Sequence, residues 1–139
     1  MLNNEKELAA LLSKVKTIAV VGAVDKPTRP VDGVCREMMA MGFEIIPVHP
    51  KRTDVWGLTT YPSILDIPKP VDVVDLFRNA NFCPAHAKET LQMKRLPKMF
   101  WMQSGVRSPE VWDILKDSGV TVVEDRCLKV ELAYLRSRS

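Results

Sequence analysis

The sequence lacks the features that mark several classes of protein. It contains only three cysteines, Cys35, Cys83 and Cys127, and none of them forms a C-x-x-C pair. Because an odd number of cysteines fits no closed disulfide framework, we expect reduced thiols and a cytoplasmic protein. No apolar run approaches the length of a membrane-spanning helix, and Met1–Lys16 is charged throughout, without the apolar segment of a signal peptide. We therefore expect no membrane association.

The sequence also has little excess of positive over negative charge, and few histidines. Lys and Arg number 20 against 17 Asp and Glu, so the formal net charge is only +3. This excess is too small for a general nucleic-acid binder, so any anion site must be local. The two histidines, His49 and His86, have no partner at metal-ligand spacing. Asp72 and Asp75 point to opposite faces of a strand and cannot act as an acid–base pair. The sequence thus predicts neither a metal site nor catalytic residues.

What the sequence does contain is a repeated alternation between strand and helix periodicity. Continuous apolar runs, typical of strands buried on both faces, predict strands at Thr17–Val21, Phe43–Val48, Leu58–Tyr61, Val71–Phe77, Met99–Met102 and Val120–Val123. Helical stripes predict helices from the cap Asn4 to Val15, from Pro30 to Gly42, from Pro84 to about Leu96, from the cap Ser108 to Gly119, and over Leu128–Leu135. Pro47 is expected to break the second strand, and Ser63 to cap a single helical turn. The pattern predicts one α/β domain over residues 1–139, doubly wound, with a mostly parallel sheet of five or six strands and helices on both faces.

The loop after the first strand is a candidate phosphate site, because doubly wound sheets bind ligands beyond the carboxyl ends of their strands. Gly22 ends that strand and lets the backbone approach a ligand closely. If Pro30 is the first helical residue, the cap is Arg29, whose side chain cannot accept a hydrogen bond, so the helix begins with unsatisfied N–H groups. With Lys26 and Arg29 beside them, these groups predict an anion site. Two alternatives remain open: Asp32 caps the helix and competes with a phosphate, or the loop is a solvated turn.

The loop after the second strand bears on the choice of cofactor. The G-x-G-x-x-G pattern of NAD sites is absent, and the place of the acid that binds the NAD ribose holds His49, Pro50, Lys51 and Arg52. Two cations there suit a ribose phosphate, which NADP and coenzyme A both carry. The residues do not separate these two cofactors, and a solvated basic loop is the alternative.

Six motifs follow one another from about residue 12 to residue 135. They are Gly22–Val24 with Arg29–Pro30, Ile46–Pro50, Tyr61–Pro68, Val71–Arg78, Trp101–Val106 and Val122–Lys129. Together they resemble the small stand-alone coenzyme A-binding proteins, which are similar to the nucleotide-binding domain of the succinyl-CoA synthetase α-subunit. The resemblance implies a Rossmann-like fold and coenzyme A as the cofactor.

The resemblance also implies a place for individual residues around the cofactor. By that likeness, Gly22, Ala23, Val24 and Arg29 would face the pyrophosphate; His49, Pro50 and Lys51 would lie near the adenosine and its phosphate; Phe77, Arg78, Gln103 and Gly105 would line the path of the adenine and the pantetheine arm.

Cys127 is the candidate reactive residue of the sequence. Arg126 precedes it and a helix begins after it, and both effects lower the pKa of a thiol. A mixed disulfide with the thiol of coenzyme A is one hypothesis, and a small buried apolar role is the alternative. Asp75 is expected to accept hydrogen bonds from loop amides at the ligand edge.

The leading hypothesis for function is non-catalytic binding of coenzyme A or an acyl-CoA by a protein whose oligomeric state stays open. An NADP-dependent or other nucleotide-using enzyme is the first alternative. The second is an interaction subunit with a vestigial pocket.

Overall fold

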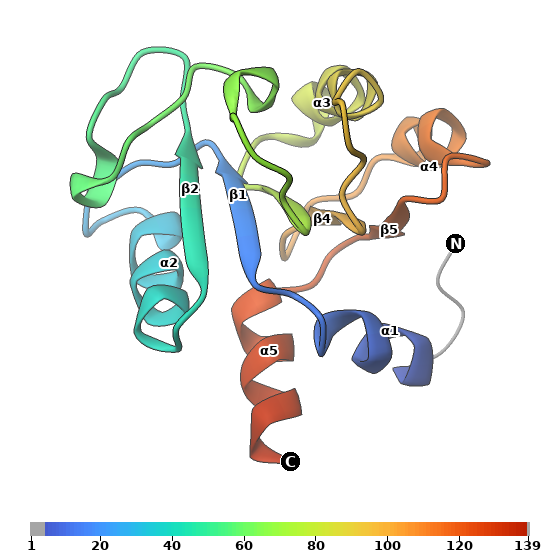
Figure 1. Ribbon diagram of the computed structural model, residues 1–139, viewed down its shortest axis with the longest axis horizontal. Coiled ribbons are helices and arrows are strands. Elements are labelled where there is room, and N and C mark those ends of the chain that lie inside the picture. Colours follow the sequence, from blue (N-terminus) through green and yellow to red (C-terminus); the bar gives the residue numbers. More distant parts are fainter. Residues whose placement is uncertain (1–4, 139) are drawn as a thin grey trace.

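Five parallel strands form one sheet in the computed structural model, which describes residues 5–138 (Figure 1). They are β1 (Thr17–Val21), β2 (Glu44–Val48), β3 (Val73–Leu76), β4 (Met99–Met102) and β5 (Thr121–Val123), arranged β2-β1-β3-β4-β5. Each neighbouring pair is parallel. The inner strands are buried on both faces, which explains their continuous apolar sequences. The predicted doubly wound α/β fold is therefore confirmed.

The predicted sixth strand, Leu58–Tyr61, is wrong, since within this segment only Tyr61 forms a bridge, to Val48. The N–H of Tyr61 donates to the carbonyl of Pro47 (3.1 Å), and the N–H of His49 donates to the carbonyl of Tyr61 (2.9 Å). Pro47 has no N–H, so the outer edge of β2 offers little pairing to a further strand. The predicted break at Pro47 is wrong for the same reason, because its missing N–H faces outward from an edge strand and β2 continues through it.

Helices connect the strands in the described part of the chain. The α-helices are α1 (Glu5–Leu12), α2 (Pro30–Ala40), α3 (Cys83–Thr90), α4 (Pro109–Leu115) and α5 (Leu128–Ser137), and the 3-10 turns are η1 (Val55–Gly57), η2 (Ile64–Asp66) and η3 (Ala80–Phe82). Ser63 caps η2 as predicted, because its hydroxyl accepts the N–H of Leu65 at 3.1 Å. The predicted cap Asn4 lies outside the described residues.

Helix α3 ends at Thr90 and not near Leu96. Beyond Thr90, the N–H of Gln92 bonds to the carbonyl of Glu89 (3.0 Å) and the N–H of Met93 to that of Thr90 (3.1 Å), three residues back instead of four. Leu91 and Leu96 are both exposed there, so little apolar packing holds the segment in a helix.

Helix α4 ends at Leu115 and not at Gly119, because Lys116 leaves the helical conformation with a ψ of 147° and Asp117 then adopts a left-handed φ of +65°. Ser108 stands at the N-cap position, but its side chain makes no capping hydrogen bond. At the two ends of the described chain, α1 ends before Val15 and α5 continues past Leu135.

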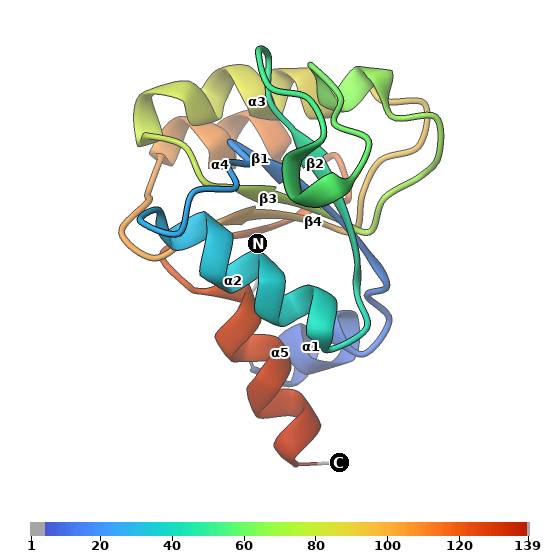
Figure 2. The ribbon, with the colours of Figure 1, turned by 90° about the vertical axis from the view of Figure 1, so that its left-hand side faces the viewer.

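Figure 2 shows three layers, with α3 and α4 on one face of the sheet and α1, α2 and α5 on the other. Alternate strand residues enter the two cores. The first core packs α3 and α4 residues against Ala19, Val21, Val74 and Leu76. The second packs α1, α2 and α5 residues against Ile18, Val20, Val73 and Trp101. Within residues 5–138, no helix has the length and apolar character needed to cross a membrane.

Candidate functional site

A hollow of about 320 Å³ opens where the chain leaves β1 and β3 in opposite directions. From β1 the chain passes through α2 to β2, and from β3 it passes through α3 to β4 on the other side. This divergence is the switch point at which doubly wound proteins bind ligands. We call the hollow the switch-point pocket. Its lining residues are Gly22, Arg29, Pro30, Val31, Val34, Phe77, Arg78, Gln103, Ser104, Val106 and Cys127.

Gly22 is required by the close approach of two loops at the pocket wall. Its φ is +88°, a conformation that L side chains rarely adopt. A Cβ atom at this position would lie 2.4 Å from the carbonyl oxygen of Phe77 and 3.2 Å from Cδ of Arg78. The N–H of Gly22 donates to the carbonyl of Val48 at 3.0 Å, which holds the loop against β2. The backbone is therefore exposed where a side chain would otherwise stand.

The N-terminus of α2 forms another part of the pocket wall. Arg29 is the N-cap and makes no side-chain capping bond, and Pro30 is the first helical residue. Both predictions are confirmed. Pro30 has no N–H, and the N–H of Asp32 donates to the carbonyl of Arg29 at 3.1 Å. The N–H of Val31 has no acceptor among the described residues, so the positive end of the helix dipole is open to an anion.

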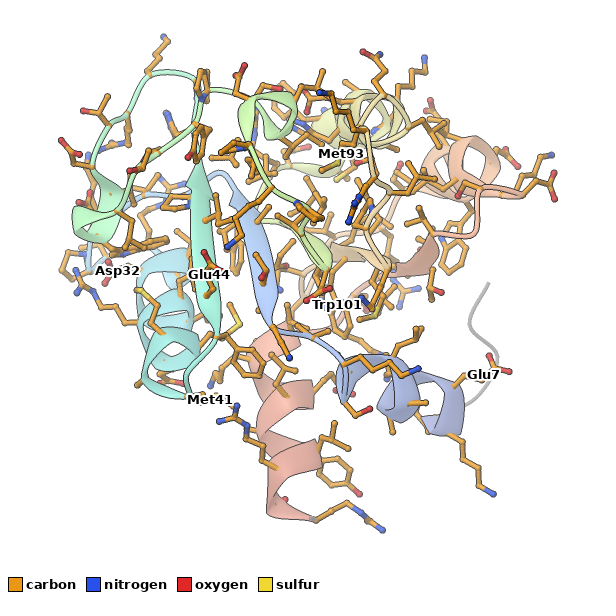
Figure 3. The ribbon with its side chains drawn as sticks, in the orientation of Figure 1. Glu7, Asp32, Met41, Glu44, Met93 and Trp101 are labelled. Atoms are coloured by element: carbon orange, nitrogen blue, oxygen red, sulfur yellow. The ribbon has the colours of Figure 1, made fainter. Side chains whose placement is uncertain are left out.

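The alternative in which Asp32 caps α2 is wrong. Its carboxylate accepts the indole N–H of Trp56 at 2.8 Å and the Nε–H of Arg36 at 3.1 Å. The hydrogen bond from Trp56, followed by Arg36, holds the pKa of Asp32 below its ordinary value. Figure 3 shows Asp32 between α2 and the η1 segment, which carries Trp56. Because this carboxylate is engaged there, it leaves the helix N-terminus to a ligand.

A second group of cations surrounds the loop after β2. The imidazole of His49 accepts the backbone N–H of Lys51 at 3.0 Å and that of Arg52 at 3.2 Å through Nδ1. Burial lowers the pKa of His49, and the nearby charges of Arg52, Arg78 and Lys51 lower it further. These three cations therefore lie close enough to act on one imidazole. One of them, Arg78, also lines the switch-point pocket.

The guanidinium of Arg78 stacks on the ring of Phe82, with 4.1 Å between Cζ and the ring centroid. A cation over an aromatic face is stabilised by the ring quadrupole. This contact holds a positive charge at the pocket wall, and no carboxylate of the described residues pairs with it.

The predicted site residues fall into two groups. Gly22, Arg29, Pro30, Phe77, Arg78, Gln103 and Cys127 line the switch-point pocket. The others do not line it. Within the loop after β1, Ala23 and Val24 are buried and Lys26 is exposed. His49, Pro50 and Lys51 follow β2, and the N–H of Gly105 donates to Asp125 Oδ1 at 2.7 Å.

Four lining residues were not predicted as site residues. Val31 and Val34 belong to the apolar stripe of α2, which indicated core packing, and Ser104 and Val106 lie in the loop after β4. An apolar stripe does not reveal which of its members face a cavity. The available signal for Ser104 and Val106 was their place directly after a buried strand.

The expectation that Asp75 accepts hydrogen bonds from loop amides is wrong. It is fully buried on β3, and its Oδ1 accepts the side-chain N–H of Gln103 at 2.6 Å. Its Oδ2 has no hydrogen-bond partner among residues 5–138. Burial raises the pKa of Asp75 to about 8, against the smaller lowering effect of the Gln103 hydrogen bond.

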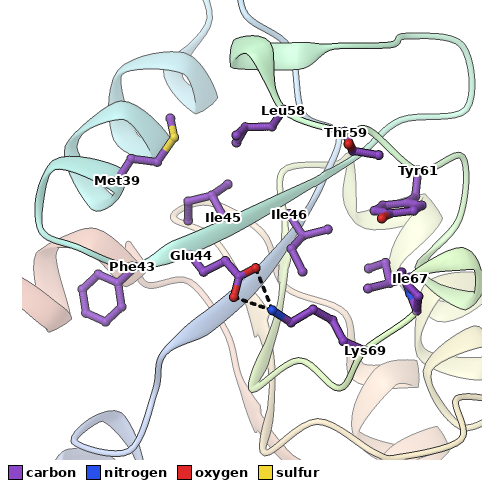
Figure 4. Close-up of a pocket in the computed structure, with 11 residues that line it drawn as sticks. Met39, Phe43, Glu44, Ile45, Ile46, Leu58, Thr59, Tyr61, Ile67 and Lys69 are labelled. Carbon is purple, nitrogen blue, oxygen red and sulfur yellow. Dashed lines mark hydrogen bonds and ion pairs between the residues drawn. The ribbon is translucent and has the colours of Figure 1, made fainter.

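A second hollow, of about 380 Å³, follows the outer edge of β2 (Figure 4). Its walls include Met39, Ile45, Ile46 and Leu58. The ammonium group of Lys69 is paired with Glu44 at 2.7 Å, as the dashed lines show. Because this hollow lies beside the sheet rather than beyond the carboxyl ends of its strands, and its cation is neutralised, it is a poor phosphate site. In the chain described, no cluster of three His, Cys, Asp or Glu side chains is arranged to hold a metal ion.

These features define the class of the protein: a doubly wound α/β domain with a basic pocket at its switch point. The chain belongs to the CoA binding domain family, which matches residues 16–133.

Known relatives agree with this assignment. The chain is 36% identical over 133 residues to the Bacillus subtilis (strain 168) protein named Uncharacterized protein YneT, covering 96% of this chain and 97% of that protein. It is 30% identical over 127 residues to the 4-hydroxybutyrate–CoA ligase (ADP-forming) of Nitrosopumilus maritimus (strain SCM1), covering 83% of this chain but only 18% of the ligase. The solved structure of cell-free ID.343 from Thermus thermophilus matches with a TM-score of 0.87 and 41% identity, over 96% of this chain and 99% of that one.

Proposed function

We propose that this chain, as one domain over residues 1–139, binds coenzyme A or an acyl-CoA in the switch-point pocket. The pyrophosphate would lie at the N-terminus of α2, beside Arg29 and the exposed backbone of Gly22. The ribose phosphate would lie toward Arg78 and the cations that follow β2. The pantetheine arm would then run along the apolar wall toward Gln103 and Cys127.

The observation that carries this proposal is the open N-terminus of α2. Asp32 is held by Trp56 and Arg36, so its carboxylate does not occupy the place of a phosphate. Membership of the CoA binding domain family supports coenzyme A over other phosphate-bearing nucleotides.

A binding role is favoured over a catalytic one by the chemistry of the wall. The lining residues include no Asp, Glu or His side chain, and Asp75, the carboxyl group that is hydrogen-bonded to Gln103, is fully buried. The ligases that match this chain are several times longer, so their activity is not carried over to it.

Thermal unfolding with three ligands tests the proposal. A ligand present at 100 times its dissociation constant stabilises the folded state by about 2.7 kcal/mol. Coenzyme A should raise the Tm, and dephospho-CoA should raise it less, because it lacks the ribose phosphate. A shift with NADP and none with coenzyme A would identify a different nucleotide site. No shift with any of the three would leave the vestigial pocket as the better reading.

Arg29→Ala tests the phosphate site directly. Removing one charge-assisted contact at an exposed position should weaken coenzyme A binding by about tenfold, measured by titration calorimetry. Arg95→Ala is the matched control. Arg95 is an exposed arginine in the segment before β4, which lies at the amino ends of the strands, whereas the pocket lies beyond their carboxyl ends. Equal affinities of the two variants would remove Arg29 from the site.

A further inference from the structure

Asp75 is a buried carboxyl group that makes no contact with the ligand in the proposed site. It lies at the centre of the sheet, in register with Val20 of β1 and Trp101 of β4. None of its surface is exposed, and Oδ2 has no partner in the described chain. Burying a polar atom without a hydrogen bond is unfavourable, so a native protein that retains such a group calls for an explanation.

Among residues 5–138, the Asp75 side chain has one hydrogen bond, and it leads to a residue of the pocket wall. Oδ1 accepts Nε2–H of Gln103 at 2.6 Å, and Gln103, which follows β4, lines the switch-point pocket while being only 6% exposed. A carboxyl group keeps an oxygen that can accept this N–H whether it is ionised or neutral. Asp75 therefore holds the nitrogen end of the Gln103 amide whether its carboxyl group is ionised or neutral.

The orientation of the amide determines what the pocket presents to a ligand. A glutamine amide has two donor hydrogens at one end and an acceptor oxygen at the other. With the nitrogen toward Asp75, the oxygen lies at the opposite end, and no group among residues 5–138 is seen to donate to it. Gln103 lines the pocket together with the apolar side chains of Phe77, Val34 and Val106.

We propose that Asp75 is a positioning residue that turns the Gln103 amide oxygen into the pocket, where it accepts a hydrogen bond from an amide N–H of the pantetheine arm. This inference rests on the proposed function and adds how the arm is recognised. The phosphates of coenzyme A are bound by cations and helix amides at the pocket rim. The pantetheine arm is uncharged, with two secondary amides, and a fixed acceptor in a mostly apolar wall matches it chemically. The buried carboxyl group of Asp75 is retained because its Oδ1 fixes that acceptor.

Two ligands separate this role from a purely structural one. Coenzyme A carries the pantetheine arm, and adenosine 3′,5′-bisphosphate carries the same ribose phosphate without it. Asp75→Val removes the acceptor for Gln103 and suits a strand. It should weaken coenzyme A binding by about threefold to tenfold, the effect of one neutral hydrogen bond. Affinity for adenosine 3′,5′-bisphosphate should stay within about twofold of wild type, well below the effect of that hydrogen bond.

Conservative rescue gives a second readout. Asp75→Asn keeps an oxygen that accepts Nε2–H of Gln103, so it should bind coenzyme A nearly as tightly as wild type. If Asp75→Val does not fold, Gln103→Met tests the same contact from the other side, because it preserves side-chain length and removes the amide. Asp113→Asn, on the exposed face of α4, is the control and should leave both affinities unchanged.

Each outcome decides a different question. If wild type binds neither ligand, the proposed function fails. If wild type binds both ligands but Asp75→Val and Gln103→Met retain full affinity for coenzyme A, or lose affinity for both ligands equally, the positioning role of Asp75 is refuted while the nucleotide site stands.

Discussion

Gly22→Ala is the sharpest test of how the pocket is built. The added Cβ would lie 2.4 Å from the carbonyl oxygen of Phe77, a backbone atom that can move only if the end of β3 moves. The substitution must also keep a φ of +88°. The close contact with Phe77 arises because β1 and β3 are neighbours, so the loops that follow them meet at the pocket wall.

The magnitude follows from these two effects. A left-handed conformation costs a non-glycine residue about 1–2 kcal/mol. Forcing extra volume into a closely packed place costs about 1–3 kcal/mol more. The free energy of unfolding should therefore fall by about 2–5 kcal/mol. At about 2–4 °C per kcal/mol for a chain near this size, the Tm should fall by roughly 5–20 °C.

Thermal unfolding and coenzyme A titration measure the two consequences of Gly22→Ala. The displaced Phe77 carbonyl and Arg78 side chain should also weaken coenzyme A binding by about tenfold or more, comparable to losing one charge-assisted contact. The matched control is Gly33→Ala on α2, where an added Cβ meets nothing within 4 Å. That change should stabilise the helix by about 0.5–1 kcal/mol. The reasoning is refuted if Gly22→Ala melts with the wild type and binds coenzyme A equally well.

Two further predictions concern titration and thiol chemistry. Burial raises the pKa of Asp75 from 3.8 to about 8. Between these two pH values the carboxyl group is protonated in the folded state and ionised in the unfolded chain. The free energy of unfolding should therefore fall as the pH rises from about 4 to about 8. Denaturant titrations should show a flatter profile for Asp75→Asn over this range, and an unchanged slope would contradict the burial effect. Coenzyme A disulfide should react at Cys127 by thiol–disulfide exchange, forming a Cys127–S–S–CoA bond and releasing one coenzyme A thiolate. Cys127 should be selected because it lines the pocket, whereas burial raises the pKa of the Cys83 thiol to about 11. Mass spectrometry without reductant should find the adduct on Cys127, and an adduct on Cys83 instead would refute this selectivity.

Local constraints made much of this protein predictable. The β-branched runs of β1 and β3 predicted buried strands, because a strand covered on both faces needs no polar alternation. Pro30 after Arg29 predicted an uncapped helix, because proline sets its own φ and arginine cannot accept a hydrogen bond from an amide. Such inferences depend on neighbouring residues alone, and the structure bears them out.

Only the tertiary structure decided which distant residues meet. Strand order places the loops after β1 and β3 side by side, and that contact makes Gly22 sterically necessary. Asp32 could have capped its own helix, but Trp56, 24 residues away, takes up its carboxylate. Asp75 and Gln103 are 28 residues apart and form a buried hydrogen bond because β3 and β4 are neighbours. Pairings of this kind depend on how the whole chain buries its apolar surface, and a pattern read along one segment carries no information about them.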